Sequence, residues 1–383
     1  MTPNQRQFER LRVAATGLLD SVAERAIAIC EVPAPTGAEG ARANFIASLL
    51  SGLGYSPERD DVGNVYARRG SRGGMAVMLA AHTDTVFPAT TNVAVRREGD
   101  CLHGPGVGDN SLGVAAMLGL LALFDALGLE TDADIIVAAT VGEEGLGNLS
   151  GIRAAVERYR ADLGAVIAVE GHNLGRVTHA GVGSTRWRLR VTGPGGHSWG
   201  AFGKPNAIHG LSRIIAQIAD LDVPSEPKTT YNIGTIEGGT SVNTIAPSAS
   251  ALVDMRSVDP GALRQLVDQV GEIAATAAGD GLTVDVEVLG ERPAGDCPRT
   301  HPLVVAAGEA LRQLGFEPVF DASSTDANIP ISLGIPALCV GITHGGQGHT
   351  TSEFIEFPPI ATGLTQLGLL TIAAATFVSG NRS

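Results

Sequence analysis

The stretch Met75–Asp84, M-A-V-M-L-A-A-H-T-D, places His82 and Asp84 directly after a short apolar run. Such a run is typical of a strand that is buried on both faces of a parallel sheet. Three further runs have the same character: Ile135–Val141, Leu163–Val169 and Ile335–Ile342. The sequence therefore predicts several parallel strands, the first of which carries His82 and Asp84 just beyond its carboxyl end.

Segments with helical spacing of apolar residues alternate with these predicted strands. They are Ser111–Leu127, Gly151–Ala161, His301–Leu314 and Ala361–Val378. Alternation of strands and helices predicts an α/β fold, in which a largely parallel sheet is covered by helices.

The middle of the chain follows a different pattern. In Thr185–Val191, arginines alternate with Trp187, Leu189 and Val191, which predicts a strand with one solvated face. The expected elements after it are a helix, two strands, a helix and a strand: Asn206–Asp220, Thr229–Glu237, Ser248–Arg256, Pro260–Ala278 and Leu282–Leu289. The order β-α-β-β-α-β is that of a ferredoxin-like unit. We therefore predict an inserted α+β domain at residues 182–291, which interrupts a domain formed by residues 1–181 and 292–383.

Composition and charge limit the partners of the chain. Its 383 residues carry a formal net charge of −13, which argues against nucleic acid or an anionic membrane as a partner. Charges are scattered over residues 1–10, where a signal peptide has its apolar core, and no run of about 18 apolar residues is evident. We expect a cytoplasmic protein. The four cysteines are far apart in the sequence, which favours free, mostly buried thiols.

Acidic and histidine residues follow the predicted strands. Glu143 and Glu144 come after Ile135–Val141, and Glu170 comes after Leu163–Val169. Asp109 precedes the Ser111 helix, and His349 lies in a glycine-rich loop. Sites in open α/β sheets form outside the carboxyl ends of the strands, so these side chains can converge on one crevice.

Each of these residues also has a purely structural interpretation. Asp109 alone could cap a helix, Glu143 and Glu144 could belong to a solvated loop, and a single His349 is more often structural. Together, however, so many carboxylates repel one another unless cations or protons offset their charge. Oxygen and imidazole ligands suit zinc, cobalt or manganese, and a shared carboxylate can hold two ions about 3.5–4 Å apart.

A competing motif lies in the predicted inserted domain. Gly196-His197-Ser198-Trp199-Gly200 fits the G-x-S-x-G nucleophile elbow of serine hydrolases. That elbow requires a buried parallel strand followed at once by a helix, whereas Ser198 follows a half-exposed strand and Pro205 delays the next helix. A serine mechanism is the weaker interpretation.

The ordered elements H-x-D, G-x-x-D, E-E and a late histidine, together with the inserted domain, resemble the M20 family of metallopeptidases over nearly the whole chain. The resemblance implies two divalent ions, with zinc expected and cobalt or manganese possible. Asp109 would bridge them, His82 and Glu170 would complete one site, and Glu144 and His349 the other. Asp84 would orient His82, and Glu143 would be the general base that activates water.

The resemblance also assigns roles within the inserted domain. His197 would stabilise the oxyanion, commonly in the active site of the partner subunit, which implies a homodimer formed through this lid or dimerisation domain. Asn243 and Arg256 match substrate-binding positions, and Asp326 matches a segment that lines the site. Without the resemblance, Asn243 would be read as holding a turn and Arg256 as pairing with Asp254.

The expected reaction is hydrolysis of an amide bond in a peptide or N-acyl amino acid with a free carboxylate. An aminopeptidase acting on di- or tripeptides and a metal-binding homologue without turnover are the alternatives. Two departures from the family pattern concern the surroundings of Asp109. Asn110 stands where many members have aspartate, and Pro105 replaces a frequent arginine.

Overall fold

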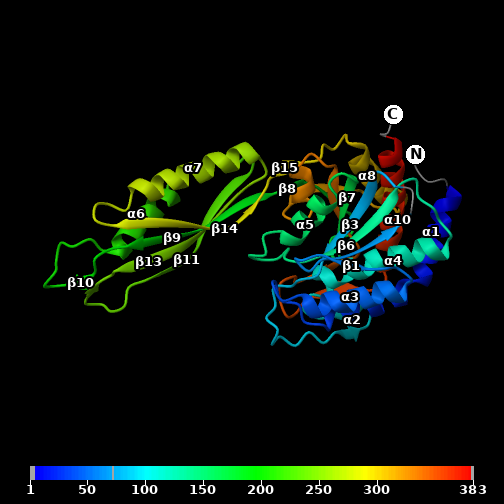
Figure 1. Cartoon of the computed structure of the whole chain (residues 1–383), viewed down its shortest axis with the longest axis horizontal. Helices are drawn as coiled ribbons and strands as arrows, with labels where there is room; N and C mark the ends of the chain where they lie inside the picture. Colours follow the sequence, from blue (N-terminus) through cyan, green and yellow to red (C-terminus); the bar gives the residue numbers. More distant parts are fainter. Residues whose placement is uncertain (1–4, 71–72, 381–383) are drawn as a thin grey trace. The chain divides into compact units, whose positions relative to one another are not determined.

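The computed structural model describes residues 5–70 and 73–380 and divides the chain into two compact units (Figure 1). Unit 1 comprises Met1–Gly181 and Asp296–Ser383, and unit 2 comprises Val182–Gly295. Residues 1–4, on which the expected absence of a signal peptide partly rests, lie outside the described residues.

Unit 1 is built on a mixed sheet whose central strands are parallel. In spatial order its first seven strands are β1 (Glu58–Arg59), β2 (Val65–Arg69), β6 (Asp134–Thr140), β3 (Ala76–His82), β7 (Leu163–Glu170), β17 (Ala337–Gly341) and β8 (Arg176–Gly181). After β8 comes β15 (Gly295–Asp296), while β16 (Val319–Ser323) also pairs with β8. β3 runs parallel to β6 and β7, and β17 runs parallel to β7. The four predicted apolar strands are thus confirmed, and the fold class with them.

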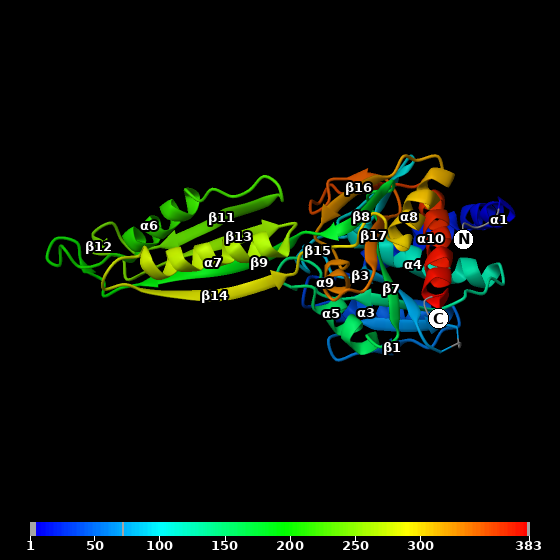
Figure 2. The ribbon, with the colours of Figure 1, turned by 90° about the horizontal axis from the view of Figure 1, so that it is seen from above.

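Helices cover both faces of this sheet (Figure 2). α4 (Gly113–Ala126) and α10 (Ile360–Gly380) pack on β3 and β7, and α8 (Pro302–Gln313) packs against α10. On the other face, α5 (Ser150–Tyr159) contacts β6 and the short α9 (Asn328–Ser332). All side chains of β3 and β6 are buried, which explains why their sequences lack alternation.

Three helices near the start of the chain complete unit 1. They are α1 (Gln5–Gly17), α2 (Leu19–Cys30) and α3 (Gly40–Gly52). α1 packs on α10 and α2 packs on α4, so these two helices lie outside the helices that touch the sheet, whereas α3 contacts β2 directly. These three helices were not predicted from the sequence.

Among the described residues, two segments are long and apolar enough to cross a membrane, Val107–Ala126 and Ile360–Gly380. Neither is an unbroken apolar run, because the first contains Asp109 and Asp125 and the second contains threonine, glutamine and serine residues. In their most apolar windows, 89% and 67% of the residues are buried inside the protein. Packing in the core of unit 1 therefore accounts for their apolar character.

Unit 2 is a four-stranded antiparallel sheet with two helices on one face. Its spatial order is β11 (Thr229–Gly238), β13 (Ser248–Ser257), β9 (Gly183–Thr192) and β14 (Thr283–Arg292). α6 (Ala207–Ala219) and α7 (Pro260–Thr276) both pack on β13 and β9. Leu189 and Val191 of β9 are buried beneath them, whereas Arg188 pairs with Glu287 on the outer face. This is the predicted ferredoxin-like order, and the alternation in β9 has the predicted cause.

A second small sheet in unit 1 links distant parts of the chain. It contains β4 (Arg96–Glu98), β5 (Cys101–His103), β18 (Gly345–Gly346) and β19 (Phe354–Glu356). β19 pairs with β5, which brings the loop between β18 and β19, residues 347–353, beside the loop that follows His103. All four cysteines are free, and three of them are buried, as expected from the sequence.

Candidate metal centre

The predicted ligands of unit 1 converge at one edge of its sheet. His82 is the last residue of β3, Glu170 is the last residue of β7, and Glu143 and Glu144 follow β6 after a turn at Gly142. Because these three strands are parallel, their carboxyl ends lie side by side. Asp109 joins them from the irregular turn Val107–Leu112 that precedes α4.

Asp109 is shared by two groups of possible ligands. Its Oδ1 lies 3.0 Å from Nε2 of His82, which is also 3.6 Å from Oε2 of Glu170. Its Oδ2 lies 3.0 Å from Nε2 of His349, which is also 2.9 Å from Oε1 of Glu144. In each group the ligand atoms lie within 4.8 Å of one another. One carboxylate thus faces two clusters of oxygen and imidazole donors, an arrangement that fits a pair of divalent cations.

The electrostatics of the cluster indicate a deficit of positive charge. Burial raises the pKa of Glu144 to about 7, and the charge of Asp109 adds to this effect. The hydrogen bond to Asp109 raises the pKa of His349 to about 9, with a further contribution from Glu144. Burial lowers the pKa of His82, but the neighbouring carboxylates outweigh it and hold that pKa well above its usual value. A bound cation would supply the positive charge that these shifts show the carboxylates to favour.

Asp84 holds the Glu143–Glu144 turn. Its Oδ1 accepts the backbone N–H of Glu143 and its Oδ2 that of Glu144, both at 2.9 Å. Nδ1 of His82 lies 3.1 Å from the backbone carbonyl oxygen of Asp84 and 3.6 Å from its carboxylate. Asp84 therefore contacts the His82 ring mainly through its carbonyl, while its carboxylate fixes the two glutamates. Glu143 belongs to a group of possible ligand atoms with His82 and Glu144.

The loop that carries His349 is strained. His349 has a φ of 63° and Gln347 a φ of 58°, values in the left-handed region that non-glycine residues rarely adopt. Such a residue costs on the order of 1–3 kcal/mol and persists only where its surroundings enforce it. The His349 side chain is 56% exposed, so the cluster is open to solvent on this side.

Asp326 lies next to the cluster and not within it. Its side chain is 2% exposed, and its Oδ2 accepts a hydrogen bond of 2.6 Å from Thr140, the last residue of β6. Burial raises the pKa of Asp326 to about 6. Its other oxygen is buried without a hydrogen-bond partner.

His197 and Ser198 lie at one end of unit 2. His197 ends the two-residue strand β10 (Gly196–His197), which pairs with β12 (Thr244–Ile245), and Ser198 begins a turn. Because the next helix, α6, begins only at Ala207, the strand-to-helix context of a nucleophile elbow is missing. Nδ1 of His197 accepts the N–H groups of Trp199 and Gly200 at 3.3 Å. The ring proton therefore resides on Nε2, which is left as a hydrogen-bond donor.

The other two candidates of unit 2 make local contacts. The exposed Asn243 accepts a hydrogen bond from Ser241 at 2.7 Å, and its carbonyl accepts the N–H of Ser198. Arg256 donates to Asp254 at 2.6 Å, and Arg186 donates to the other oxygen of that carboxylate. Both residues thus make the local contacts expected without the resemblance, Asn243 within a turn and Arg256 with Asp254. Their roles toward a substrate stay predictions.

Asn110 and Pro105, the two departures from the family pattern, each make specific contacts in the structure. The Asn110 amide donates to the carbonyl of Val169 at 2.8 Å and accepts the N–H of Gly171 at 3.0 Å. An ionised aspartate could accept but not donate, so asparagine satisfies both strand-end groups beside Glu170. The carbonyl of Pro105 faces the buried Cys30 thiol at 3.3 Å.

Several supporting residues were not found from the sequence. Thr36 donates to Asp84 at 2.9 Å, and the buried Arg42 donates to the Thr83 carbonyl at 2.8 Å. Glu353 is fully buried and accepts three backbone N–H groups from the loop of Asp109. Its position four residues after His349 was the only available signal.

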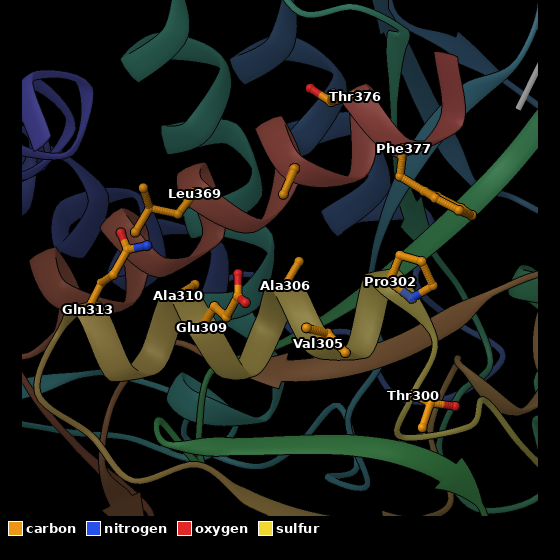
Figure 3. A pocket seen from close by; sticks show the side chains of 11 residues that line it. Thr300, Pro302, Val305, Ala306, Glu309, Ala310, Gln313, Leu369, Thr376 and Phe377 are labelled. Carbon is orange, nitrogen blue, oxygen red and sulfur yellow. The ribbon is translucent and has the colours of Figure 1, made fainter. Parts of the chain in front are cut away.

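A separate groove of about 500 Å³ lies between α8 and α10 (Figure 3). Val305, Ala306 and Glu309 of α8 face Leu369 and Phe377 of α10 across it. None of the predicted ligands lines this groove, so it is distinct from the candidate metal centre.

The chain is similar to known proteins along most of its length. The sequence profile of peptidase family M20/M25/M40 matches residues 78–371. A succinyl-diaminopimelate desuccinylase of Corynebacterium glutamicum is 28% identical over 337 residues, which cover 85% of this chain and 89% of that one.

Solved structures share the fold. Aminopeptidase PepT of Bacillus cereus matches with a TM-score of 0.78 at 21% identity, covering 93% of this chain and 99% of that chain. A dinuclear metal-binding M20 peptidase of Bacillus subtilis matches with a TM-score of 0.71 at 17% identity, covering 93% and 98%. The family match spans most of the chain and includes every predicted ligand. The protein is therefore a hydrolase that belongs to peptidase family M20/M25/M40.

Proposed function

We propose that the chain binds two divalent ions, with zinc the expected metal, and hydrolyses the amide bond of a peptide or N-acyl amino acid with a free carboxylate. The observation that carries this proposal is Asp109, whose two oxygens each face a histidine of a different ligand group. One ion would be held by His82, Asp109 and Glu170, and the other by Asp109, Glu144 and His349.

The side chains of the site suit amide hydrolysis without a covalent intermediate. When bound, two divalent ions lower the pKa of water and polarise a carbonyl group. Glu143 would take a proton from the attacking water and deliver it to the nitrogen of the breaking C–N bond. Asp84 supports this role because it fixes the backbone of Glu143. The free amine and the carboxylic acid then leave separately.

The relatives favour deacylation over other reactions of the family. The desuccinylase that matches along most of the chain removes an acyl group from an amino acid, whereas the aminopeptidase likeness concerns the fold. An aminopeptidase-type di- or tripeptidase is the second candidate. A homologue without turnover is disfavoured by the presence of Glu143, and a serine hydrolase by the turn at Ser198. We place the enzyme in the cytoplasm, as a homodimer formed through unit 2.

A substrate panel tests the proposed function. The metal-loaded protein would be assayed with N-acyl amino acids, their carboxamide derivatives and dipeptides, before and after chelation. We expect chelator-sensitive hydrolysis of the free acids and much weaker hydrolysis of the carboxamides. Equal rates for acids and carboxamides would contradict recognition of a free carboxylate.

Two arginines allow the origin of carboxylate recognition to be traced. Arg256 and Arg186 both pair with Asp254, so replacing either removes one hydrogen bond to that carboxylate. If Arg256 binds the substrate carboxylate, Arg256→Gln should raise KM for the acids by about 10–100-fold, the scale of a hydrogen bond to a charged group. Arg186→Gln should leave KM near the wild-type value. Equal effects of both variants would assign the loss to Asp254.

His197 and Ser198 can be distinguished by single substitutions. We expect His197→Ala to lower kcat by roughly 10²-fold or more, the scale of one lost oxyanion donor, with both metals retained. Ser198→Ala should have a modest effect, whereas a serine mechanism would lose all activity. Steady-state kinetics with metal analysis of both variants measures the difference, and an inactive Ser198→Ala enzyme would reverse the assignment.

Mixing variants tests whether His197 acts in a partner subunit. A heterodimer of His197→Ala and Glu143→Gln chains contains one site with both intact residues. Random pairing in a two-fold dimer would then restore at most about a quarter of the wild-type activity per chain. No recovery despite demonstrated subunit exchange would place His197 in its own subunit or outside the mechanism.

A further inference from the structure

Glu353 lies behind the candidate metal centre, where the loops of two predicted ligands meet. Its Oε1 accepts the backbone N–H groups of Gly108 and Asp109 at 2.8 Å, and its Oε2 accepts that of Gly106 at 2.7 Å. Its backbone carbonyl accepts the N–H of Gly104 at 3.0 Å. A single residue, four positions after His349, thus holds the whole loop that leads to Asp109.

His172 connects this contact to a third ligand segment. It lies two residues after Glu170, and its Nε2 is 3.0 Å from Oε1 of Glu353. The ring is closely confined by two glycines. A Cβ at Gly108 would lie 2.2 Å from its Nε2, and a Cβ at Gly345 would lie 2.6 Å from its Nδ1. Because only glycine permits such an approach, the ring occupies a fixed place between the two loops.

We propose that Glu353, together with His172, is a positioning residue that holds the segments of Asp109, Glu170 and His349 in the arrangement that binds metal. The inference rests on the proposed function, since it concerns the same two ions. Glu353 is fully buried and touches no predicted ligand side chain among its hydrogen bonds, so it acts through the backbone. Its carboxylate supplies acceptors for N–H groups that would otherwise be buried without partners.

The substitution Glu353→Gln removes this function with little change in size. Both carboxylate oxygens of Glu353 accept from N–H groups, so the amide nitrogen of glutamine would face a donor in either orientation. The loop of Asp109 would then be released on one side. The site of Asp109, Glu144 and His349 should suffer more than the other, because Glu353 lies on the same segment as His349 and contacts the segment of Asp109.

The test is a calorimetric titration of the metal-free protein with Zn²⁺, together with absorption spectra of the Co²⁺ form. We expect Glu353→Gln to weaken binding of the more weakly held ion by about 10–100-fold, the usual effect of losing a partner that orients metal ligands. The Co²⁺ spectrum should change as well. At saturating metal, kcat should return to within a few-fold of wild type, because Glu353 takes no part in the chemistry.

A matched control separates this effect from general destabilisation. Asp134 is also a buried carboxylate of unit 1, but it lies at the opposite end of β6, where it pairs with Arg68. Asp134→Asn should lower thermal stability without changing either metal affinity. If both variants lose metal binding equally, the role of Glu353 is merely structural.

His172→Gln serves as the second variant, since it leaves all three backbone hydrogen bonds of Glu353 in place. We expect a smaller loss of affinity for the same ion, and this variant decides the question if Glu353→Gln does not fold. Unchanged affinities and spectra in a folded Glu353→Gln protein, beside a wild type that binds two ions, would refute this inference and leave the proposed function standing. A wild type that binds no ion pair would refute both.

Discussion

Replacing Glu143 with glutamine is expected to leave both metal ions bound and to lower kcat by at least about 10²–10⁴-fold, the usual contribution of a general acid or base. Glutamine keeps the size of the side chain but cannot accept the proton of the attacking water. Metal analysis and steady-state kinetics on the same sample measure the two quantities. The expected separation of metal content from turnover is what distinguishes a base from a ligand.

The neighbouring residue provides the control. Glu144 differs from Glu143 by one position in the same turn, and both backbone N–H groups are held by Asp84. Glu144 belongs to the ligand group of Asp109 and His349, so Glu144→Gln should lose affinity for one ion. Glu143→Gln should not, because Glu143 is the expected base and not a ligand. Near-normal kcat in a fully metallated Glu143→Gln enzyme would assign the base to another residue.

The second large effect is expected for Asp109→Ala, which should lose both ions and, with them, activity. Each oxygen of Asp109 faces a different histidine, so its removal leaves each ligand group one carboxylate oxygen short. The four remaining predicted ligands would still be present but would no longer share a bridge. Equilibrium dialysis against zinc, followed by metal analysis, measures the loss, and chelation of the wild type should abolish activity in the same assay.

His349→Ala is the informative comparison for this variant. His349 belongs to only one of the two ligand groups, so its removal should weaken one ion and spare the other. Retention of two tightly bound ions by Asp109→Ala would contradict the bridging role. If His349→Ala also lost both ions, binding at one site would depend on binding at the other, and loss of both ions from Asp109→Ala would no longer show that Asp109 bridges them.

The strands of unit 1 could be predicted because burial on both faces leaves a recognisable sequence pattern. Every residue of β3 is buried, and its sequence contains no polar residue before His82. The end of such a run also locates the ligands, since the polar side chain appears where the strand leaves the core. His82, Glu144 and Glu170 can be located in this way from the sequence alone.

The contacts that hold the ligands could not be predicted, because they join residues far apart in the sequence. Glu353 accepts hydrogen bonds from Gly106, nearly 250 positions earlier, and such pairing leaves no local periodicity. Thr36 and Asp84 are likewise brought together only by the fold. A backbone N–H offers no sequence signal at all, so its partner is visible only in the structure.

The direction of the Asp326 side chain could not be predicted from its position in the sequence. Its segment was expected to line the site, but the side chain is buried and bonded to Thr140. Sequence order indicates which loop approaches the sheet edge, whereas the direction of one side chain depends on packing that the pattern does not encode. Its role toward a substrate stays a prediction.

The insertion of unit 2 also shapes how the protein is made on the ribosome. β7 ends at Glu170, and its partner β17 begins only at Ala337, after all of unit 2 has been synthesised. Until then, one edge of an apolar strand has unpaired backbone groups, which is the kind of surface that leads to aggregation. Unit 2 has its own core and can fold during this interval. Because Arg292 near the end of unit 2 pairs with Ser184 near its start, the folded insert returns the chain to unit 1 close to where it left, as a long flexible loop would not.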